Sequence, residues 1–245
     1  MVDIAAAVRA DLVPTGKLRA GVNYGNFILA KKDGATGKSS GVAIDLLQEL
    51  ARRLGVPLEI IAYDSVAVMG DAAPTNVWDI AFLGSDPQRE KLMSFTPAYL
   101  EIDATYLVPG ASPFRAATEV DREGARIAAP VRANFELFLG RNLKHAQLVS
   151  TQGGSAAFDL LAAGKVDALA GLTQVLLDLV EKLPGSRVLD GRFMGVQQAI
   201  AVPKGRSSGL DYLRRVVEEV KVSGLVARAI ERTGVRGISV APLAD

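Results

Sequence analysis

The chain has 245 residues, of which 49% are apolar and 22% charged, and it carries 24 glycines and 11 prolines. This composition fits an α/β protein of one large domain or two small lobes, and the net charge of +1 gives no support to a nucleic-acid or membrane surface. Without cysteine, disulfides and thiolate metal sites are excluded, and the single histidine, His145, argues against a His-based triad or zinc site.

The N-terminal part predicts a short helix at residues 3–12 and a first strand at residues 17–22. The strand leads into a turn-prone loop, Asn23-Tyr24-Gly25-Asn26. In open α/β sheets, ligands bind at the carboxyl ends of the strands. Asn23, Tyr24 and Asn26 are therefore candidate ligand contacts, with an ordinary turn as the alternative.

An amphipathic helix is predicted over residues 41–54, with Leu46, Leu47, Leu50 and Leu54 on one face. Gly55 ends the helix. A strand at residues 58–62 follows and ends near Asp64, a further candidate ligand contact, before a second helix at about residues 65–73.

The stretch from Asp79 to Leu100 carries the strongest site signal. Ile80–Leu83 reads as a buried strand that Gly84, Ser85, Asp86 and Pro87 break, with Asp86 as the predicted cap of a short helix. Arg89 then places a guanidinium beside the free N–H groups of that turn, which suits a carboxylate. The alternative is a solvated surface arginine. Gly84, Ser85 and Arg89 are candidate ligand contacts.

The rest of the chain continues the alternation of strands and helices, which indicates a mainly parallel sheet. Strands are predicted at residues 126–129, 147–150 and 166–170, and helices at 134–143, 155–163, 174–183, 208–222 and 225–233. Segments near residues 102–105 and 193–202 read as two crossings between lobes; the second contains Gln197 and Gln198. The expected fold is α/β, with lobe 1 at residues 1–103 and 198–245 and lobe 2 at 104–197, joined by a two-strand hinge that permits closure.

The run Asp86-Pro87-Gln88-Arg89, followed by Phe95-Thr96-Pro97-Ala98-Tyr99, resembles the T-x-E-R…F-S-x-P-Y signature of solute-binding protein family 3. This family contains the type II periplasmic binding proteins that bind polar amino acids for ABC transporters. The resemblance extends from about Lys17 to Gly234. It implies a type II periplasmic binding protein fold, a carboxylate held by Arg89, an ABC permease as partner, a periplasmic location, a monomer and no cofactor.

The second half of the resemblance departs from the family at two places. Members usually carry Gly-Ser or Gly-Thr before the helix that begins here at Asn134, whereas this chain has Arg132. A helix N-terminus attracts anions, so we expect Arg132 and Asn134, together with Thr173, to contact the ligand. The alternative for Arg132 is an outward, solvated side chain.

The other departure concerns the ligand's ammonium group. Amino-acid binders of the family place a carboxylate where this chain has Leu172, and no acidic residue lies between Asp167 and Asp178. Since a buried ammonium without a partner is costly, an anionic or neutral organic acid is the expected ligand, unless Asp64 faces the cleft.

The expected function is solute binding without catalysis, and no catalytic or metal-binding residue is predicted. A dehydratase-like enzyme, resembling cyclohexadienyl dehydratase, or a ligand-sensing module on the same scaffold stay as alternatives. The first twelve residues contain Asp3, Arg9 and Asp11 and no apolar core, so they are not a signal peptide, and a full-length product of this sequence is expected in the cytoplasm.

Overall fold

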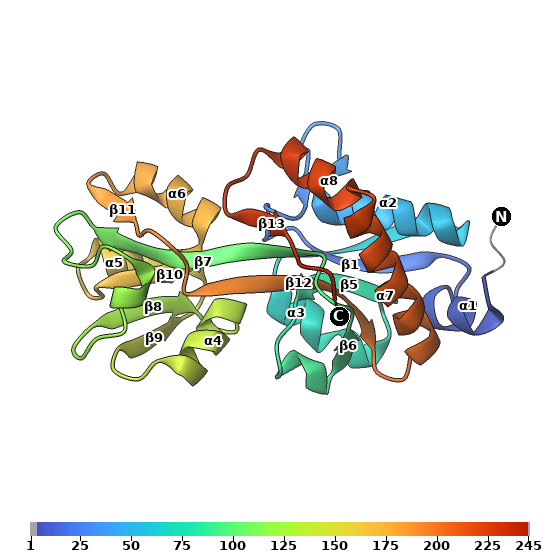
Figure 1. Cartoon of the computed structure of the whole chain (residues 1–245), viewed down its shortest axis with the longest axis horizontal. Helices are drawn as coiled ribbons and strands as arrows, with labels where there is room; N and C mark the ends of the chain where they lie inside the picture. The colour runs from blue at the N-terminus through green and yellow to red at the C-terminus, as the bar shows by residue number, and fades with distance from the viewer. Residues whose placement is uncertain (1–3, 245) are drawn as a thin grey trace. The chain divides into compact units, whose positions relative to one another are not determined.

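The computed structural model describes residues 4–244, which divide into two compact units (Figure 1). Unit 1 contains the chain up to Glu101, Gln197–Val235 and the segment from Ser239 onward. Unit 2 contains Ile102–Val196 and Arg236–Ile238. Two long strands, β7 (Leu100–Pro109) and β12 (Met194–Pro203), carry the chain from one unit to the other.

Unit 1 is a mixed sheet with helices on both faces. Its strands are ordered β4-β1-β5-β12, with β1 parallel to both β4 and β5, and β12 antiparallel to β5 and β6. Besides the unit 1 parts of β7, β12 and β13, its elements are α1 (Ala6–Leu12), β1 (Leu18–Asn23), β2 (Lys31–Lys32), β3 (Ser39–Ser40), α2 (Val42–Leu54), β4 (Leu58–Tyr63), α3 (Val66–Asp71), η1 (Ala73–Thr75), β5 (Ile80–Gly84), η2 (Arg89–Lys91), β6 (Met93–Phe95), α7 (Ser207–Val222) and α8 (Leu225–Thr233).

The apolar periodicity of the sequence explains which surfaces unit 1 buries. Leu46, Leu47, Leu50 and Leu54 of α2 are all buried, and the helix ends at Gly55, whose φ of 65° is left-handed. On the sheet face that carries Ala81 and Leu83, Met69 of α3 packs with Trp78, which is fully buried. Helices α2 and α8 lie together on the other side of these strands (Figure 1).

Unit 2 is also a mixed sheet packed against helices, with fewer elements than unit 1. Its strands are ordered β7-β10-β8-β9, with β8 parallel to β9 and β10, and β7 antiparallel to β10. Apart from the unit 2 parts of β7 and β12, its elements are η3 (Ala117–Glu119), β8 (Arg126–Pro130), α4 (Asn134–Asn142), β9 (Gln147–Thr151), α5 (Gly154–Ala162), β10 (Ala168–Leu172), α6 (Thr173–Lys182) and β11 (Ser186–Val188), and β13 (Ile238–Val240) begins here and ends in unit 1.

The core of unit 2 has a layer on each face of the sheet. Leu139 of α4 packs over Ile127 and Ala129, while Leu161 of α5 and Leu176 of α6 pack over Ala128 and its neighbours. The alternation of strand side chains between the two layers is that of a sheet buried on both faces. The α/β class expected from the sequence is confirmed in both units.

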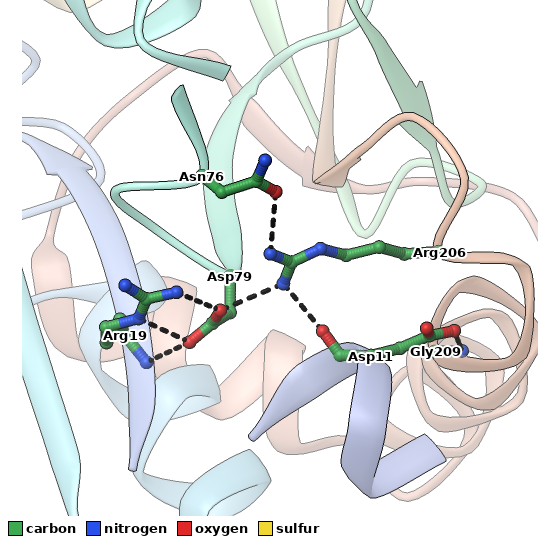
Figure 2. A network of polar contacts seen from close by, with 6 residues as sticks. All are labelled: Asp11, Arg19, Asn76, Asp79, Arg206 and Gly209. Atoms are coloured by element: carbon green, nitrogen blue, oxygen red, sulfur yellow. Dashed lines mark hydrogen bonds and ion pairs between the residues drawn. The ribbon is translucent and has the colours of Figure 1, made fainter. Parts of the chain in front are cut away.

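A polar network fixes one end of the unit 1 sheet (Figure 2). Asp79, whose side chain is 0% exposed, directly precedes β5 and accepts bonds from the backbone and guanidinium of Arg19 on β1 at 2.7–3.0 Å. Arg206 donates to the same carboxylate at 2.9 Å and to the carbonyl of Asp11 at 2.6 Å. The network joins strands β1 and β5 to α1 and to the start of α7. It lies at the amino ends of these strands, so it does not occupy their carboxyl ends.

Candidate functional site

The carboxyl ends of the parallel strands β1, β4 and β5 form one edge of the unit 1 sheet. They end at Asn23, Tyr63 and Gly84, and the register pairs Asn23 with Tyr63. Every unit 1 residue predicted as a ligand contact follows one of these ends or is its last residue. Ligands bind at this kind of edge in α/β sheets.

Arg89 is held inside this edge. Only 9% of its surface is exposed, and its Nη1 donates to the carbonyl of Gly84 at 2.7 Å. Asp86, 3% exposed, shapes the turn between them, because its Oδ1 accepts the backbone N–H of Gln88 at 2.8 Å. Gly84 is buried and Ser85 half-buried beside it. The interpretation of Arg89 as a solvated surface arginine does not agree with this burial.

The turn itself differs from the predicted short helix capped by Asp86. Pro87 stays outside the helical segment, which is a single 3₁₀ turn, Arg89–Lys91, with Gln88 preceding it. The carboxylate of Asp86 accepts the backbone N–H of Gln88, two residues further along the chain. It therefore stabilises a tight turn rather than the start of an α-helix.

The loop after β1 is tied down by its own polar groups. Tyr24 donates its backbone N–H to Tyr63 at 2.8 Å, and its hydroxyl lies 2.5 Å from Ser39 Oγ on β3. Asn23 Oδ1 accepts the N–H of Gly25 at 3.0 Å, so this side chain stabilises the loop.

Asn26, at the end of this loop, and Asp64, next to it after β4, differ in how far they are exposed to solvent. The carboxamide oxygen of Asn26 is covered and has no hydrogen-bond partner among the residues that the structure describes. Asp64 is exposed, and its carbonyl lies 2.5 Å from where a Cβ at Gly25 would stand, which restricts that position to glycine.

In unit 2, the parallel strands β8, β9 and β10 end at Pro130, Thr151 and Leu172. Arg132 follows β8 as an exposed residue with φ of 64°, a left-handed conformation that is uncommon outside glycine. Asn134, 7% exposed, is the first residue of α4. The structure thus places Arg132 and Asn134 at the same strand edge.

Glu136 is the residue that the sequence interpretation missed at this edge. It is 9% exposed, and it accepts the backbone N–H of Arg132 at 3.0 Å and the hydroxyl of Ser150 at 2.7 Å. The signal was present, because a Glu at the third position of a helix commonly reaches back to the preceding backbone. Glu136 holds the loop that carries Arg132.

Thr173 begins α6 directly after Leu172, which is half-buried. Its hydroxyl donates to the carbonyl of Asp103 at 3.1 Å, and its side chain lies against Gly237. The hydroxyl therefore already has a backbone partner within unit 2.

Two other classes of site find no support in residues 4–244. No group of three or more His, Asp or Glu side chains there is arranged to hold a metal ion. Within the same range, every helix is too short or too polar to cross a bilayer.

Comparison with known proteins gives a consistent result. The model of the bacterial extracellular solute-binding proteins, family 3, matches residues 18–233. The chain is 23% identical over 202 residues to the L-cystine-binding protein TcyJ of Escherichia coli K12, an alignment that covers 81% of this chain and 76% of the relative.

Solved structures of similar proteins share the fold. An amino acid ABC transporter substrate-binding protein of Streptococcus pneumoniae bound to L-arginine has a TM-score of 0.72 at 24% identity, covering 97% of this chain and all of the other. The ancestral amino acid-binding protein AncCDT-1, a precursor of cyclohexadienyl dehydratase, has a TM-score of 0.73 at 21% identity, covering 93% and 99%. The fold is that of the type II periplasmic binding proteins.

Proposed function

We propose, from the premise that the chain belongs to family 3 of the bacterial extracellular solute-binding proteins, that it binds a small carboxylate-bearing solute for an ABC importer. The observation that carries the proposal is the buried guanidinium of Arg89 at the carboxyl edge of the unit 1 sheet. A buried arginine binds a carboxylate through two parallel N–H bonds, which fixes the orientation of the ligand as well as its charge.

The structure of the turn supports this role for Arg89. One N–H of the guanidinium goes to Gly84, which fixes the plane of the group, and Asp86 fixes the turn that carries it. A site arranged in this way before the ligand arrives loses little side-chain entropy on binding. Ser85 and the loop residues Asn23, Tyr24, Asn26 and Asp64 complete the proposed contacts in unit 1.

The proposed contacts in unit 2 are Arg132, Asn134 and Thr173. They follow the carboxyl ends of β8 and β10, in the same structural context as the unit 1 contacts. Closure of residues 1–103 with 198–245 onto residues 104–197, with β7 and β12 as hinge strands, would enclose a ligand between two such edges.

The ligand class follows from which charges these edges supply. The relatives named above bind L-cystine and L-arginine, and an amino-acid-like ligand is the broad expectation from the family. Leu172 ends β10 without a carboxylate, and Asp64 is exposed. The buried carboxylates of Glu136 and Asp86 accept bonds from their own loops. Since an ammonium group in a closed site needs an anionic partner, we favour an organic acid within the carboxylate class.

An enzyme of the dehydratase type is the second candidate, because AncCDT-1 is a precursor of cyclohexadienyl dehydratase. Acid–base chemistry needs a positioned proton donor or acceptor. His145 is exposed and follows α4 at the far end from Asn134, and Asp64 is exposed as well. Binding without turnover is therefore the preferred function, with an ABC permease as partner, a monomeric state and an extracytoplasmic location as further parts of the proposal.

A thermal-shift screen of small carboxylates, amino acids and neutral polar solutes tests this function. A ligand at a hundred times its dissociation constant adds about 2.7 kcal/mol of stability. We expect a carboxylate to raise the melting temperature and to be recovered unchanged after prolonged incubation, as checked by NMR. Conversion of the bound acid would support the enzyme instead, and stabilisation by neutral solutes alone would contradict the carboxylate site.

A further inference from the structure

Gln198 is a buried polar residue for which the proposed contacts give no role. It lies on β12, is 3% exposed, and its side-chain carbonyl oxygen is fully covered without a hydrogen-bond partner among residues 4–244. Leaving a buried acceptor unpaired destabilises the folded protein. Nearly all buried polar groups in proteins are paired, so this oxygen requires an explanation.

The strand register places Gln198 next to the proposed carboxylate site. It pairs directly with Gly84 across the antiparallel β5–β12 ladder, and the Gly84 carbonyl accepts a hydrogen bond from Arg89. The neighbouring backbone is also fixed, since Ser85 donates to Gln197 and Tyr99 donates to Gln198 at 2.9 and 2.8 Å. Cα atoms of directly opposed residues in such a ladder lie about 4.5–5.5 Å apart. The backbone of Gln198 is therefore one strand spacing from Gly84, whose carbonyl accepts the hydrogen bond from Arg89.

We infer that Gln198 is a further ligand-contacting residue, whose carboxamide oxygen accepts a hydrogen bond from a hydroxyl group close to the carboxylate that Arg89 binds. This inference rests on the proposed function and narrows its ligand class to hydroxy acids. A neutral amide oxygen satisfies a hydroxyl, whereas an ammonium group calls for a charged acceptor.

The consequence is selectivity against acids without the hydroxyl. A site built to pair with a hydroxyl rejects the analogue that lacks it, because the buried acceptor then stays unpaired in a closed site. Tyr99 provides an internal comparison. Its hydroxyl also lacks a hydrogen-bond partner within the described part of the chain, but the residue is 0% exposed and packs edge-on against Phe82, with the ring centroids 5.6 Å apart, so it is enclosed in the core.

The test measures binding of matched acids to three proteins by titration calorimetry. The probes are L-malate against succinate and L-lactate against propionate, and the proteins are the wild type, Gln198→Met and the control Tyr99→Phe. We expect the wild type and Tyr99→Phe to bind the hydroxylated member of one pair at least tenfold more tightly. Gln198→Met should reduce this preference to less than twofold while its melting temperature without ligand stays equal or rises.

Two results overturn the inference while leaving the proposed function intact. One is equal affinity of the wild type for the hydroxylated and the deoxy acid; the other is a preference that survives in Gln198→Met. The proposed function itself is contradicted, and this inference with it, if none of these acids and no other carboxylate of the screen binds the wild type.

Discussion

At the scale of single residues, the same arginine–aspartate arrangement occurs in both units. Asp79 precedes β5 and pairs with Arg19 on β1, and Asp167 precedes β10 and pairs with Arg126 on β8. In each pair the aspartate carboxylate also accepts the backbone N–H of the arginine. The backbone N–H of the aspartate donates to the arginine carbonyl at 2.8 Å. The pairs differ in exposure, since the Asp79 side chain is 0% exposed and that of Asp167 39%.

This difference predicts unequal effects of the same substitution. Asp79→Asn leaves Arg19 and Arg206 beside a neutral group in the interior, so we expect unfolding to require about 3–5 kcal/mol less free energy. Asp167→Asn removes a half-exposed pair and should cost less than about 1 kcal/mol. Urea titrations of both variants measure the two losses. Equal losses would contradict a special role for the buried network.

Arg132 is a residue at which stability and the proposed function are expected to conflict. Its left-handed φ of 64° costs about 1 kcal/mol relative to glycine. Arg132→Gly should therefore leave stability unchanged or raise it by up to about 1 kcal/mol, while it weakens binding of a carboxylate. Denaturation and ligand titration on Arg132→Gly, with Arg132→Lys as the charge-retaining control, test both parts. Unaltered affinity in Arg132→Gly would show that the side chain does not contact the ligand.

At the scale of elements, ion pairs connect helix α2 to helix α7. Glu49 accepts bonds from Arg52 and Arg53 on its own helix at 2.7–2.8 Å, and Arg53 also binds Glu219 on α7. The hydrogen bond from Arg52, followed by that from Arg53, lowers the pKa of Glu49 to about 2. The pKa is depressed in the folded state, so this stabilisation is complete above about pH 4.5 and is lost as the pH falls toward 2.

Glu49→Gln tests the sign of this linkage. Arg52 is 71% exposed, which limits the effect, and we expect the variant to be about 1 kcal/mol less stable at pH 7. The difference from the wild type should shrink steadily between pH 5 and pH 3. Chemical denaturation at several pH values at low salt measures it. A difference that does not change with pH would contradict the assignment.

Gly234 and Gly237 form a matched pair near the end of the chain. Both have positive φ, 64° and 70°, but a Cβ at Gly234 meets nothing within 4 Å, whereas one at Gly237 lies 2.8 Å from the Cβ of Thr173. Gly234→Ala should cost about 1 kcal/mol from backbone strain alone, and Gly237→Ala about 1–3 kcal/mol more because Thr173 must move. Thermal unfolding compares them. Equal effects would indicate that the Gly237–Thr173 packing does not contribute to stability.

The sequence predicts the long elements and misses the short ones for a physical reason. Apolar periodicity identifies helices such as α2, α7 and α8, because their 13, 16 and 9 residues are long enough to repeat the pattern. Strands β2, β3, β6, β11 and β13 are only two or three residues long, which is too short for any periodicity to appear. Strands β6, β11 and β13 form because a longer strand lies beside them, and β2 and β3 form by pairing with each other. Neither kind of contact is visible in local sequence.

At the scale of the whole molecule, the predicted site residues divide between the two units. Seven of them lie in unit 1, namely Asn23, Tyr24, Asn26, Asp64, Gly84, Ser85 and Arg89, and Arg132, Asn134 and Thr173 lie in unit 2. The chain passes between units at residues 101–102, 196–197, 235–236 and 238–239. The sequence predicts two crossings, near residues 103 and 198, and assigns the whole C-terminal part to lobe 1. The short C-terminal passage through unit 2 depends on contacts such as Asp103 N–H with Gly237 at 2.8 Å.

The predicted strands and turns indicate where the candidate site residues lie in the chain, but they do not indicate which residues form hydrogen bonds with each other. The rule that strand ends carry ligands makes Arg89 a candidate from sequence alone, and the attraction of a helix N-terminus for anions makes Arg132 one. The bonds from Tyr24 to Ser39 and from Thr173 to Asp103 join residues 15 and 70 positions apart, so they depend on the folded chain. The same limit applies to Gln198, whose unpaired oxygen is a property of its surroundings.

The proposed function depends above all on Arg89 binding the carboxylate of a small solute. The most direct test titrates the best carboxylate of the thermal-shift screen into the wild type, Arg89→Lys and Arg89→Ala by calorimetry, with circular dichroism as a check on folding. Loss of a charge-assisted bidentate pair should weaken binding by about 10- to 150-fold in Arg89→Ala, with Arg89→Lys in between. If a folded Arg89→Ala binds the same acid as tightly as the wild type, Arg89 does not bind the carboxylate.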